Sequence, residues 1–225
     1  MADIHYLDNP LETEELLEML CPPVRNWFKD KFPDFTEPQK LAIPAIINHE
    51  HLLLCSPTGS GKTLTAFLSI IDQLVRRALD NKLEKRVYCV YISPIKALAN
   101  DIQRNLIGPL TEISESYLPS RAQEIRVGLR TGDTPQSERQ KMLRNPPHIL
   151  ITTPESLAIA ITSPRFQPIV SEVEYMIIDE LHSLVPSKRG VHLALTLSYL
   201  DTLLTRPVQR IGISATMEPL ETVAE

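Results

Sequence analysis

The sequence predicts an α/β fold in which a mostly parallel central sheet carries helices on both faces. Two observations lead to this fold class. Six short apolar runs alternate with longer helical segments from residue 51 onward, and such alternation implies parallel strands joined by right-handed crossovers. Most of the runs are continuous and rich in Ile, Val, Leu or Tyr, as expected for strands buried on both faces. The predicted strands are Leu52–Cys55, Val87–Ile92, Ile125–Arg130, Ile149–Thr152, Tyr175–Ile178 and Arg210–Ser214.

Amphipathic segments around these strands are predicted to be the covering helices. Before the first strand, residues 11–32 indicate one or two helices interrupted at Pro22-Pro23, and Pro38 opens a short helix toward Ile47. We therefore divide the chain into an N-terminal helical extension, residues 1–31, and an α/β domain, residues 32–225. The longer helical segments are Thr63–Leu79, Lys96–Leu118 and Val191–Leu204.

Length and composition limit what the chain can be. Its 225 residues, 43% of them hydrophobic, suffice for one sizeable α/β domain. No apolar run approaches the ~20 residues of a membrane span, and the polar N-terminus does not resemble a secretory signal. Three widely spaced cysteines, Cys21, Cys55 and Cys89, indicate reduced thiols rather than a zinc site. We therefore expect a cytoplasmic protein with no membrane partner.

The charge balance limits how the chain could bind nucleic acid. Its formal net charge is −5, whereas duplex-binding modules typically carry a strong basic surplus. Any contact with nucleic acid must therefore come from local groups on one face of the domain.

A phosphate loop is predicted directly after the first strand. Ser56-Pro-Thr-Gly-Ser-Gly-Lys-Thr63 lies between a strand and a helix, which is the context that such a loop requires. Glycines let successive N–H groups point inward at phosphate oxygens, and the helix start adds its positive end. The strict pattern begins with Gly where this chain has Ser56, so an unrelated Gly-rich turn is the alternative. The predicted nucleotide contacts are Thr58, Gly59, Ser60, Gly61, Lys62 and Thr63.

A pair of acids ends the fifth predicted strand. Asp179 is placed to hold Mg²⁺ together with the hydroxyl of Thr63, and Glu180 is placed to orient and deprotonate a water molecule. Lys62, reaching the β- and γ-phosphates, and Glu180 are the predicted catalytic residues. Two buried acids are costly without a cation; the alternative is a solvated pair that opens a turn. His182, two residues on, is either a structural hydrogen-bonding residue or a link from this site to other parts.

Asp179-Glu-Leu-His182 after a phosphate loop resembles the DExH helicases of superfamily 2. Thr36-Glu-Pro-Gln39 resembles the glutamine motif of that family, in which the amide pairs with adenine. The resemblance implies that Gln39 binds the base and that Phe35, or alternatively Phe32, lines it. Ser214-Ala-Thr216 matches the family's third motif, which implies that Ser214 and Thr216 couple ATP to strand binding.

Three further segments resemble the loops with which this family grips a nucleic-acid backbone. They follow the second, third and fourth predicted strands and offer N–H and hydroxyl donors that need no net basic charge. For Thr152-Thr-Pro-Glu155 a plain helix N-cap is an equal alternative. The residues that the resemblance implies are Pro94, Lys96, Thr131, Gly132, Thr153 and Pro154.

Two longer matches, Tyr91–Asp101 and Asp179–Gly190, resemble the Lhr (large helicase-related) family. That resemblance implies a RecA-like phosphate-loop NTPase domain, ATP and Mg²⁺ as cofactors, and a helicase that moves 3′ to 5′ on single strands of DNA or RNA and opens duplexes or hybrids. Members of the family also have a second RecA-like domain that supplies arginines to the γ-phosphate, and we expect that domain to be missing from these 225 residues. We therefore expect the chain to bind ATP but to be weak or inactive alone. The alternative is a nucleotide-gated strand-binding or annealing module.

Overall fold

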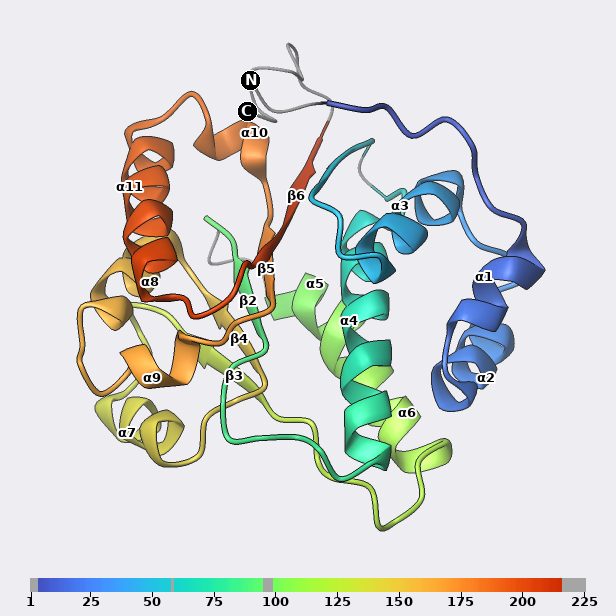
Figure 1. The fold of residues 1–225 in the computed structure, drawn as a ribbon, viewed down its shortest axis with the longest axis horizontal. Coiled ribbons are helices and arrows are strands. Elements are labelled where there is room, and N and C mark those ends of the chain that lie inside the picture. The colour runs from blue at the N-terminus through green and yellow to red at the C-terminus, as the bar shows by residue number, and fades with distance from the viewer. Residues whose placement is uncertain (1–3, 58, 95–98, 216–225) are drawn as a thin grey trace.

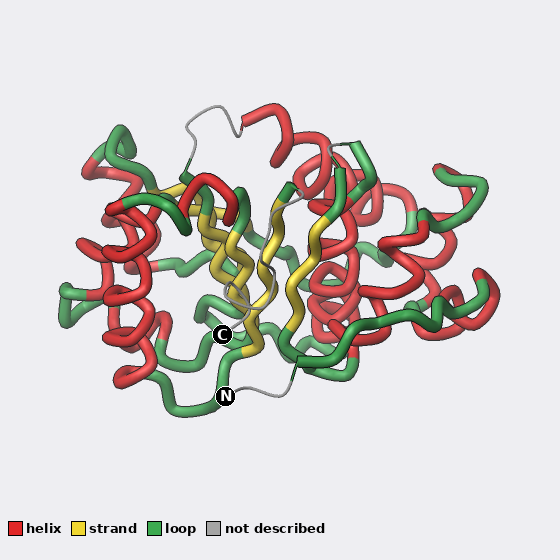
Figure 2. Tube along the Cα trace, turned by 90° about the horizontal axis from the view of Figure 1, so that it is seen from above, coloured by secondary structure: helices red, strands yellow, loops and turns green. Residues whose placement is uncertain are grey.

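The computed structural model describes residues 4–57, 59–94 and 99–215. Its centre is a sheet of six parallel strands in the order β1-β6-β5-β2-β4-β3. Helices cover both faces of this sheet (Figures 1 and 2), so the predicted fold class is confirmed. The strands are β1 (Leu52–Cys55), β2 (Cys89–Ile92), β3 (Val127–Arg130), β4 (Ile149–Thr152), β5 (Tyr175–Ile178) and β6 (Gln209–Ser214).

Side chains alternate between two hydrophobic cores, one on each face of the sheet. On β2, Tyr91 packs toward one face and Val90 toward the other, and on β5 Ile177 and Met176 divide in the same way. The face of Tyr91 is covered by α1 (Thr13–Met19), α2 (Pro22–Lys31), α3 (Glu37–Ile47), α4 (Lys62–Leu79) and α6 (Gly108–Ser116). The opposite face is covered by α7 (Gln136–Arg144), α8 (Pro154–Ile161), α9 (Gln167–Val170), α10 (Leu181–Leu184) and α11 (Lys188–Leu203).

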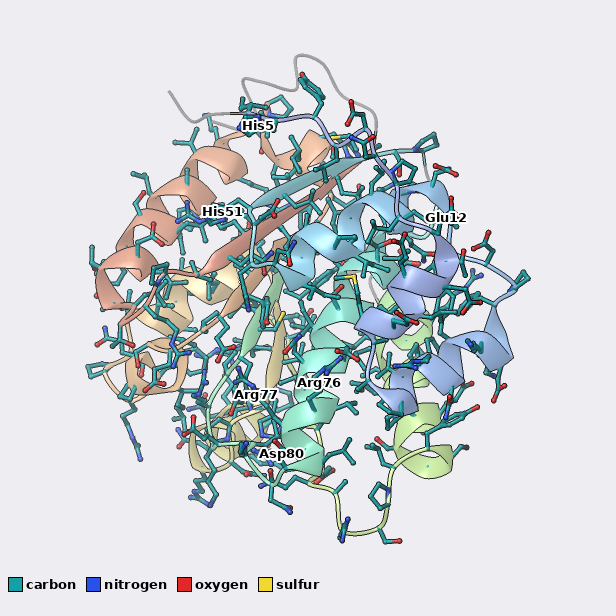
Figure 3. The ribbon with its side chains drawn as sticks, turned by 45° about the vertical axis from the view of Figure 1, so that its right-hand side comes forward. His5, Glu12, His51, Arg76, Arg77 and Asp80 are labelled. Atoms are coloured by element: carbon teal, nitrogen blue, oxygen red, sulfur yellow. The ribbon has the colours of Figure 1, made fainter. Side chains whose placement is uncertain are left out.

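The N-terminal helices share the first of these cores. Leu16, Val24 and Phe28 are fully buried in it. Polar contacts add to this packing, because the buried Asp72 of α4 accepts hydrogen bonds from the Cys21 backbone N–H (2.6 Å) and from Arg76 Nε (2.7 Å). Figure 3 shows Arg76 on α4 facing these helices. A boundary between extension and domain at residue 31 stays a prediction.

The predicted helix over residues 96–118 is divided in the structure. It comprises α5 (Ala99–Ile102), a π-helical turn (Gln103–Ile107) and α6, with residues 95–98 outside the described part. Three helices, α7, α9 and α10, were not predicted, and the start of α8 was predicted only as the alternative N-cap interpretation of Thr152–Glu155. In α7 only Met142 is buried, so no apolar period marks it, while α8, α9 and α10 are too short for a clear period. No helix in the described part of the chain is long and apolar enough to cross a membrane.

Candidate active site

The carboxyl ends of three neighbouring strands bring the predicted site residues together. In the register of the sheet, Cys55 at the end of β1 lies beside Ser214 at the end of β6, and Ile178 of β5 lies beside Gly212 of β6. The phosphate loop, the acidic pair and the Ser-Ala segment therefore leave the sheet at one edge. Ligands of open parallel sheets bind at this edge.

The phosphate loop has the curled backbone that its glycines predict. Gly59 and Gly61 adopt φ of 85° and 84°, a region that other residues rarely occupy. The Ser56 and Ser60 hydroxyls lie 2.5 Å apart across the loop. Ser56, which stands where the strict pattern has Gly, thus forms a hydrogen bond within the loop. Thr58 lies outside the described residues.

Lys62 is the first residue of α4, and its ammonium group is hydrogen-bonded to the backbone of the phosphate loop. Its Nζ donates to the carbonyl oxygens of Ser56 and, at 2.7 Å, Pro57. Partial burial lowers the pKa of Lys62, and the charges of Asp179 and Glu180 oppose that effect. The lysine and both acids therefore share one electrostatic environment, as a phosphate and metal site requires.

Asp179 is a buried carboxylate, 7% exposed, at the end of β5. Burial raises its pKa, opposed by hydrogen bonds from the Tyr91 hydroxyl and from the Glu180 backbone N–H, the latter at 2.8 Å. Tyr91 is a site residue that the sequence did not reveal, because it lies within an otherwise apolar strand. A buried, partly compensated carboxylate close to Lys62 and to the start of α4 is suited to a divalent cation, so the donor set fits Mg²⁺.

His182 connects the acidic pair to the end of β6. Its Nδ1 accepts from the Ala215 backbone N–H (3.2 Å) and lies 3.3 Å from Ser214 Oγ. Because a backbone N–H can only donate, the neutral ring carries its proton on Nε2, which lies 3.1 Å from Glu180 Oε2. The ring therefore links Glu180 to β6, as the predicted coupling role of His182 and Ser214 requires. Thr216 lies outside the described residues.

Gln39 reaches the phosphate loop from α3. Its Oε1 accepts from the Thr36 backbone N–H (2.9 Å) in a capping box, and a Cβ added to Gly61 would lie 3.2 Å from its Nε2. The Thr36 hydroxyl donates to the Ser60 carbonyl at 3.1 Å. The predicted base-binding segment is thus hydrogen-bonded to the phosphate loop itself.

The two candidate aromatic residues differ in their surroundings. Phe35 is 4% exposed and stacks on Phe28 with ring centroids 3.9 Å apart. Phe32 is 37% exposed. Base contact by Phe35, or alternatively by Phe32, stays a prediction.

The predicted strand-contacting residues lie at the carboxyl ends of β2, β4 and β3, which are neighbours in the sheet. Pro94 follows β2, while Thr131 and Gly132 follow β3. After β4, Thr153 is the N-cap of α8 and accepts from the Ser156 N–H at 3.4 Å, with Pro154 in the first turn. The N-cap role of Thr153 is therefore present, and contact of these residues with a nucleic-acid strand stays a prediction. Lys96 lies outside the described residues.

Comparison with known proteins gives the family of this chain. The family model described as DEAD/DEAH box helicase matches residues 36–223. The ATP-dependent helicase Lhr-Core of Methanocaldococcus jannaschii is 50% identical, over 100% of this chain and 27% of its own length. The Lhr helicase/uracil glycosylase of Escherichia coli is 47% identical, over 96% of this chain and 14% of its own length.

A solved structure agrees with these relatives. The Mycobacterium smegmatis helicase Lhr, bound to ssDNA and AMP-PNP, superposes with a TM-score of 0.82 and 44% identity, over 92% of this chain and 26% of that one. The fold is accordingly that of a RecA-like helicase domain, and the resemblance to Lhr helicases is confirmed. The chain spans about a quarter of the archaeal relative and of this solved chain. It belongs to the DEAD/DEAH box helicase family.

Proposed function

We propose that this chain is the ATP-binding first motor domain of a helicase that moves along single-stranded nucleic acid and opens duplexes. The observation that carries the proposal is the meeting of Lys62, Asp179 and the Glu180–His182 pair at one edge of the sheet. Lys62 would bind the β- and γ-phosphates, with the N–H groups of the phosphate loop around them. Thr63 and Asp179 would hold Mg²⁺, which draws charge from the transferring phosphoryl group.

Glu180 would act on the attacking water. Its carboxylate would orient the water and accept a proton from it, while His182 fixes the carboxylate through Nε2. His182 also bonds to β6, so a change at the γ-phosphate would be passed to Ser214 and Ala215. Strand contact would fall to the loops after β2, β3 and β4, which lie at the same edge of the sheet.

The greater length of the relatives supports the proposal of a partner domain. Phosphate-loop enzymes that receive an arginine from elsewhere gain about 10³–10⁵ in rate. We propose that a second RecA-like domain supplies such arginines, that movement is 3′ to 5′, and that the present chain alone turns over ATP slowly. The likeness to a helicase described as bound to ssDNA and AMP-PNP supports the proposal.

Nucleic-acid-stimulated turnover tests this function. In the longer protein that we propose, single-stranded DNA or RNA should raise ATP turnover, and Glu180→Gln should remove turnover while leaving nucleotide binding largely intact. The measurement is phosphate release with and without strand, together with displacement of labelled duplex strands. ATP turnover that does not change when nucleic acid is added would refute the motor function. Binding of nucleic acid without displacement of a duplex strand would indicate an annealing module.

Gln39→Ala should weaken discrimination between adenine and guanine nucleotides. The amide is placed between the start of α3 and the phosphate loop, and its loss also removes half of a capping box, at a cost of about 1 kcal/mol. Competition of ATP and GTP against a fluorescent ATP analogue gives the ratio of the two affinities. An unchanged ratio, with only a lower melting temperature, would make Gln39 a purely structural residue.

A further inference from the structure

Arg189 joins three segments that are distant in the sequence. It lies in the first turn of α11, and its Nε donates to Glu155 Oε1 at 2.6 Å. Its Nη2 donates to Glu155 Oε2 at 3.2 Å and to the Pro94 carbonyl oxygen at 3.0 Å. One guanidinium group therefore connects the start of α11 to the start of α8 and to the segment after β2.

The segment after β2 and the start of α8 both belong to loops that are candidates for nucleic-acid contact. Pro94 is itself a candidate residue, and Glu155 follows the candidates Thr153 and Pro154. A planar guanidinium can hold a carboxylate through two N–H groups while a third N–H points elsewhere. Arg189 uses this geometry to fix the separation of the two loops, which a lysine could not reproduce.

The backbone that carries Arg189 is tied to the nucleotide site. The helix α10 begins directly after Glu180, and the Ser187 hydroxyl, at the N-cap of α11, donates to the Leu184 carbonyl at 2.7 Å. Position 190 has no room for a side chain, because a Cβ added to Gly190 would lie 2.2 Å from the Leu184 carbonyl oxygen. The end of α10 and the first turn of α11 therefore pack directly against each other.

We infer that Arg189 is a positioning residue, which holds Pro94 after β2 and the start of α8 at a fixed separation and makes nucleic-acid binding by these segments depend on the nucleotide site through α10. The inference rests on the proposed function and deepens it. Strand-contacting loops need defined spacing because phosphate contacts fix the register of a bound strand. Arg189 supplies that spacing from the element that directly follows Glu180 and His182.

The ion pair contributes little to folding, and this makes the inference testable. The side chains of Arg189 and Glu155 are 44% and 50% exposed, and ion pairs between exposed side chains contribute little to stability. Variants at either position should therefore fold. A merely structural pair would leave strand binding unchanged, whereas a positioning pair would alter strand binding without altering nucleotide binding.

The experiment is titration of this chain with a fluorescent oligothymidylate at about 50 mM salt, with and without an ATP analogue and Mg²⁺. In the wild type the analogue should change strand affinity about fivefold or more. In Arg189→Ala the analogue's effect should shrink to about twofold or less, with strand affinity reduced in both states. Affinity for the analogue without strand, and the melting temperature, should stay at the wild-type values.

Glu155→Ala separates positioning from simple charge. If Arg189 acted only as a positive charge near the strand, removing its carboxylate partner would strengthen strand binding. Positioning predicts the opposite, a loss similar to that of Arg189→Ala. Arg210→Ala is the matched control, because Arg210 forms a comparably exposed pair with Asp201 (43% each) on β6 and α11. Within the part of the chain that the structure describes, its hydrogen bonds go to Asp201 and His51 and to neither loop.

The outcomes are distinguishable. Stronger strand binding by Glu155→Ala, or wild-type behaviour of Arg189→Ala, would overturn the inference and leave the proposed function standing. Weaker strand binding with an undiminished analogue effect would overturn the link through α10. A wild-type chain that binds the analogue but no strand in either state would overturn strand binding as a function, and the inference with it.

Discussion

Replacing Lys62 by alanine is expected to weaken ATP binding by at least about 100-fold. The ammonium group is the principal positive charge inside the phosphate loop, where its Nζ already donates to the carbonyl oxygens of Ser56 and Pro57. Hydrogen bonds to charged groups contribute about 1.5–3 kcal/mol each, and 1.4 kcal/mol corresponds to a tenfold change in affinity. Titration with a fluorescent ATP analogue in the presence of Mg²⁺ measures the loss.

Lys82→Ala provides the control for that measurement. Lys82 follows α4, is 72% exposed and pairs only with Asp80 among the described residues, so its loss should leave affinity within about twofold. The melting temperatures of both variants should be compared, since the Lys62 hydrogen bonds also hold the loop. Wild-type affinity in Lys62→Ala would refute the assignment of the phosphate loop.

The largest effect on stability is expected at Glu174, at the opposite edge of the sheet. Its carboxylate is 8% exposed and accepts from Arg77 (2.8 and 2.7 Å), Arg86 (2.7 Å) and Arg206 (3.2 Å). Glu174→Ala would leave these arginines without their common partner. Breaking a buried pair costs about 3–5 kcal/mol, and we expect about 3 because Arg77 and Arg206 are 31% and 43% exposed.

Urea unfolding measures this loss, with Glu172→Ala as the control. Glu172 also pairs with Arg206 but is 45% exposed, so its loss should cost less than about 1 kcal/mol. If the two variants were equally stable, Glu174 would not organise this cluster. Figure 3 shows Arg77 beside Arg76 on α4, so one helix supports both the N-terminal helices and this cluster.

The same cluster predicts a pH dependence. Burial raises the pKa of Glu174, but hydrogen bonds from Arg77 and Arg86 outweigh burial and hold it below the usual 4.5. A carboxylate with a lowered pKa in the folded state stabilises the protein fully above its unfolded-state value, and this contribution is lost as pH falls through the folded-state value. The difference in stability between wild type and Glu174→Ala should therefore shrink below about pH 4.5.

Local sequence was enough to predict the strands and to pick out most of the residues that the fold brings together at the candidate site. Ile149–Thr152 and Tyr175–Ile178 are strands with the predicted bounds, because continuous apolar runs mark strands buried on both faces. The strand predicted to begin at Val87 begins at Cys89 in the structure, because the Val87 N–H bonds to the Ile169 carbonyl of α9 rather than to a neighbouring strand. The phosphate loop and the acids were found because their chemistry requires fixed residue types at fixed spacing.

What remained hidden depends on contacts between distant residues. The sequence does not show that β6 lies between β1 and β5, and so it could not place His182 beside Ala215. Tyr91 looks like any strand residue until the fold brings Asp179 to its hydroxyl. Likewise the partners of Glu174 come from α4, from the segment before β2 and from the segment before β6, and no pattern within one segment marks them.

The backbone of Glu180 bears on how any substitution of that residue should be interpreted. It adopts φ 57° and ψ 37°, the left-handed conformation, in which a side chain with a Cβ costs about 1 kcal/mol or more. Glycine would relax this turn and asparagine would tolerate it, so either would alter folding energy and chemistry together. Glutamine keeps the strained backbone and the length of the side chain. A defect in Glu180→Gln therefore reports the change from carboxylate to amide, without a change in backbone strain.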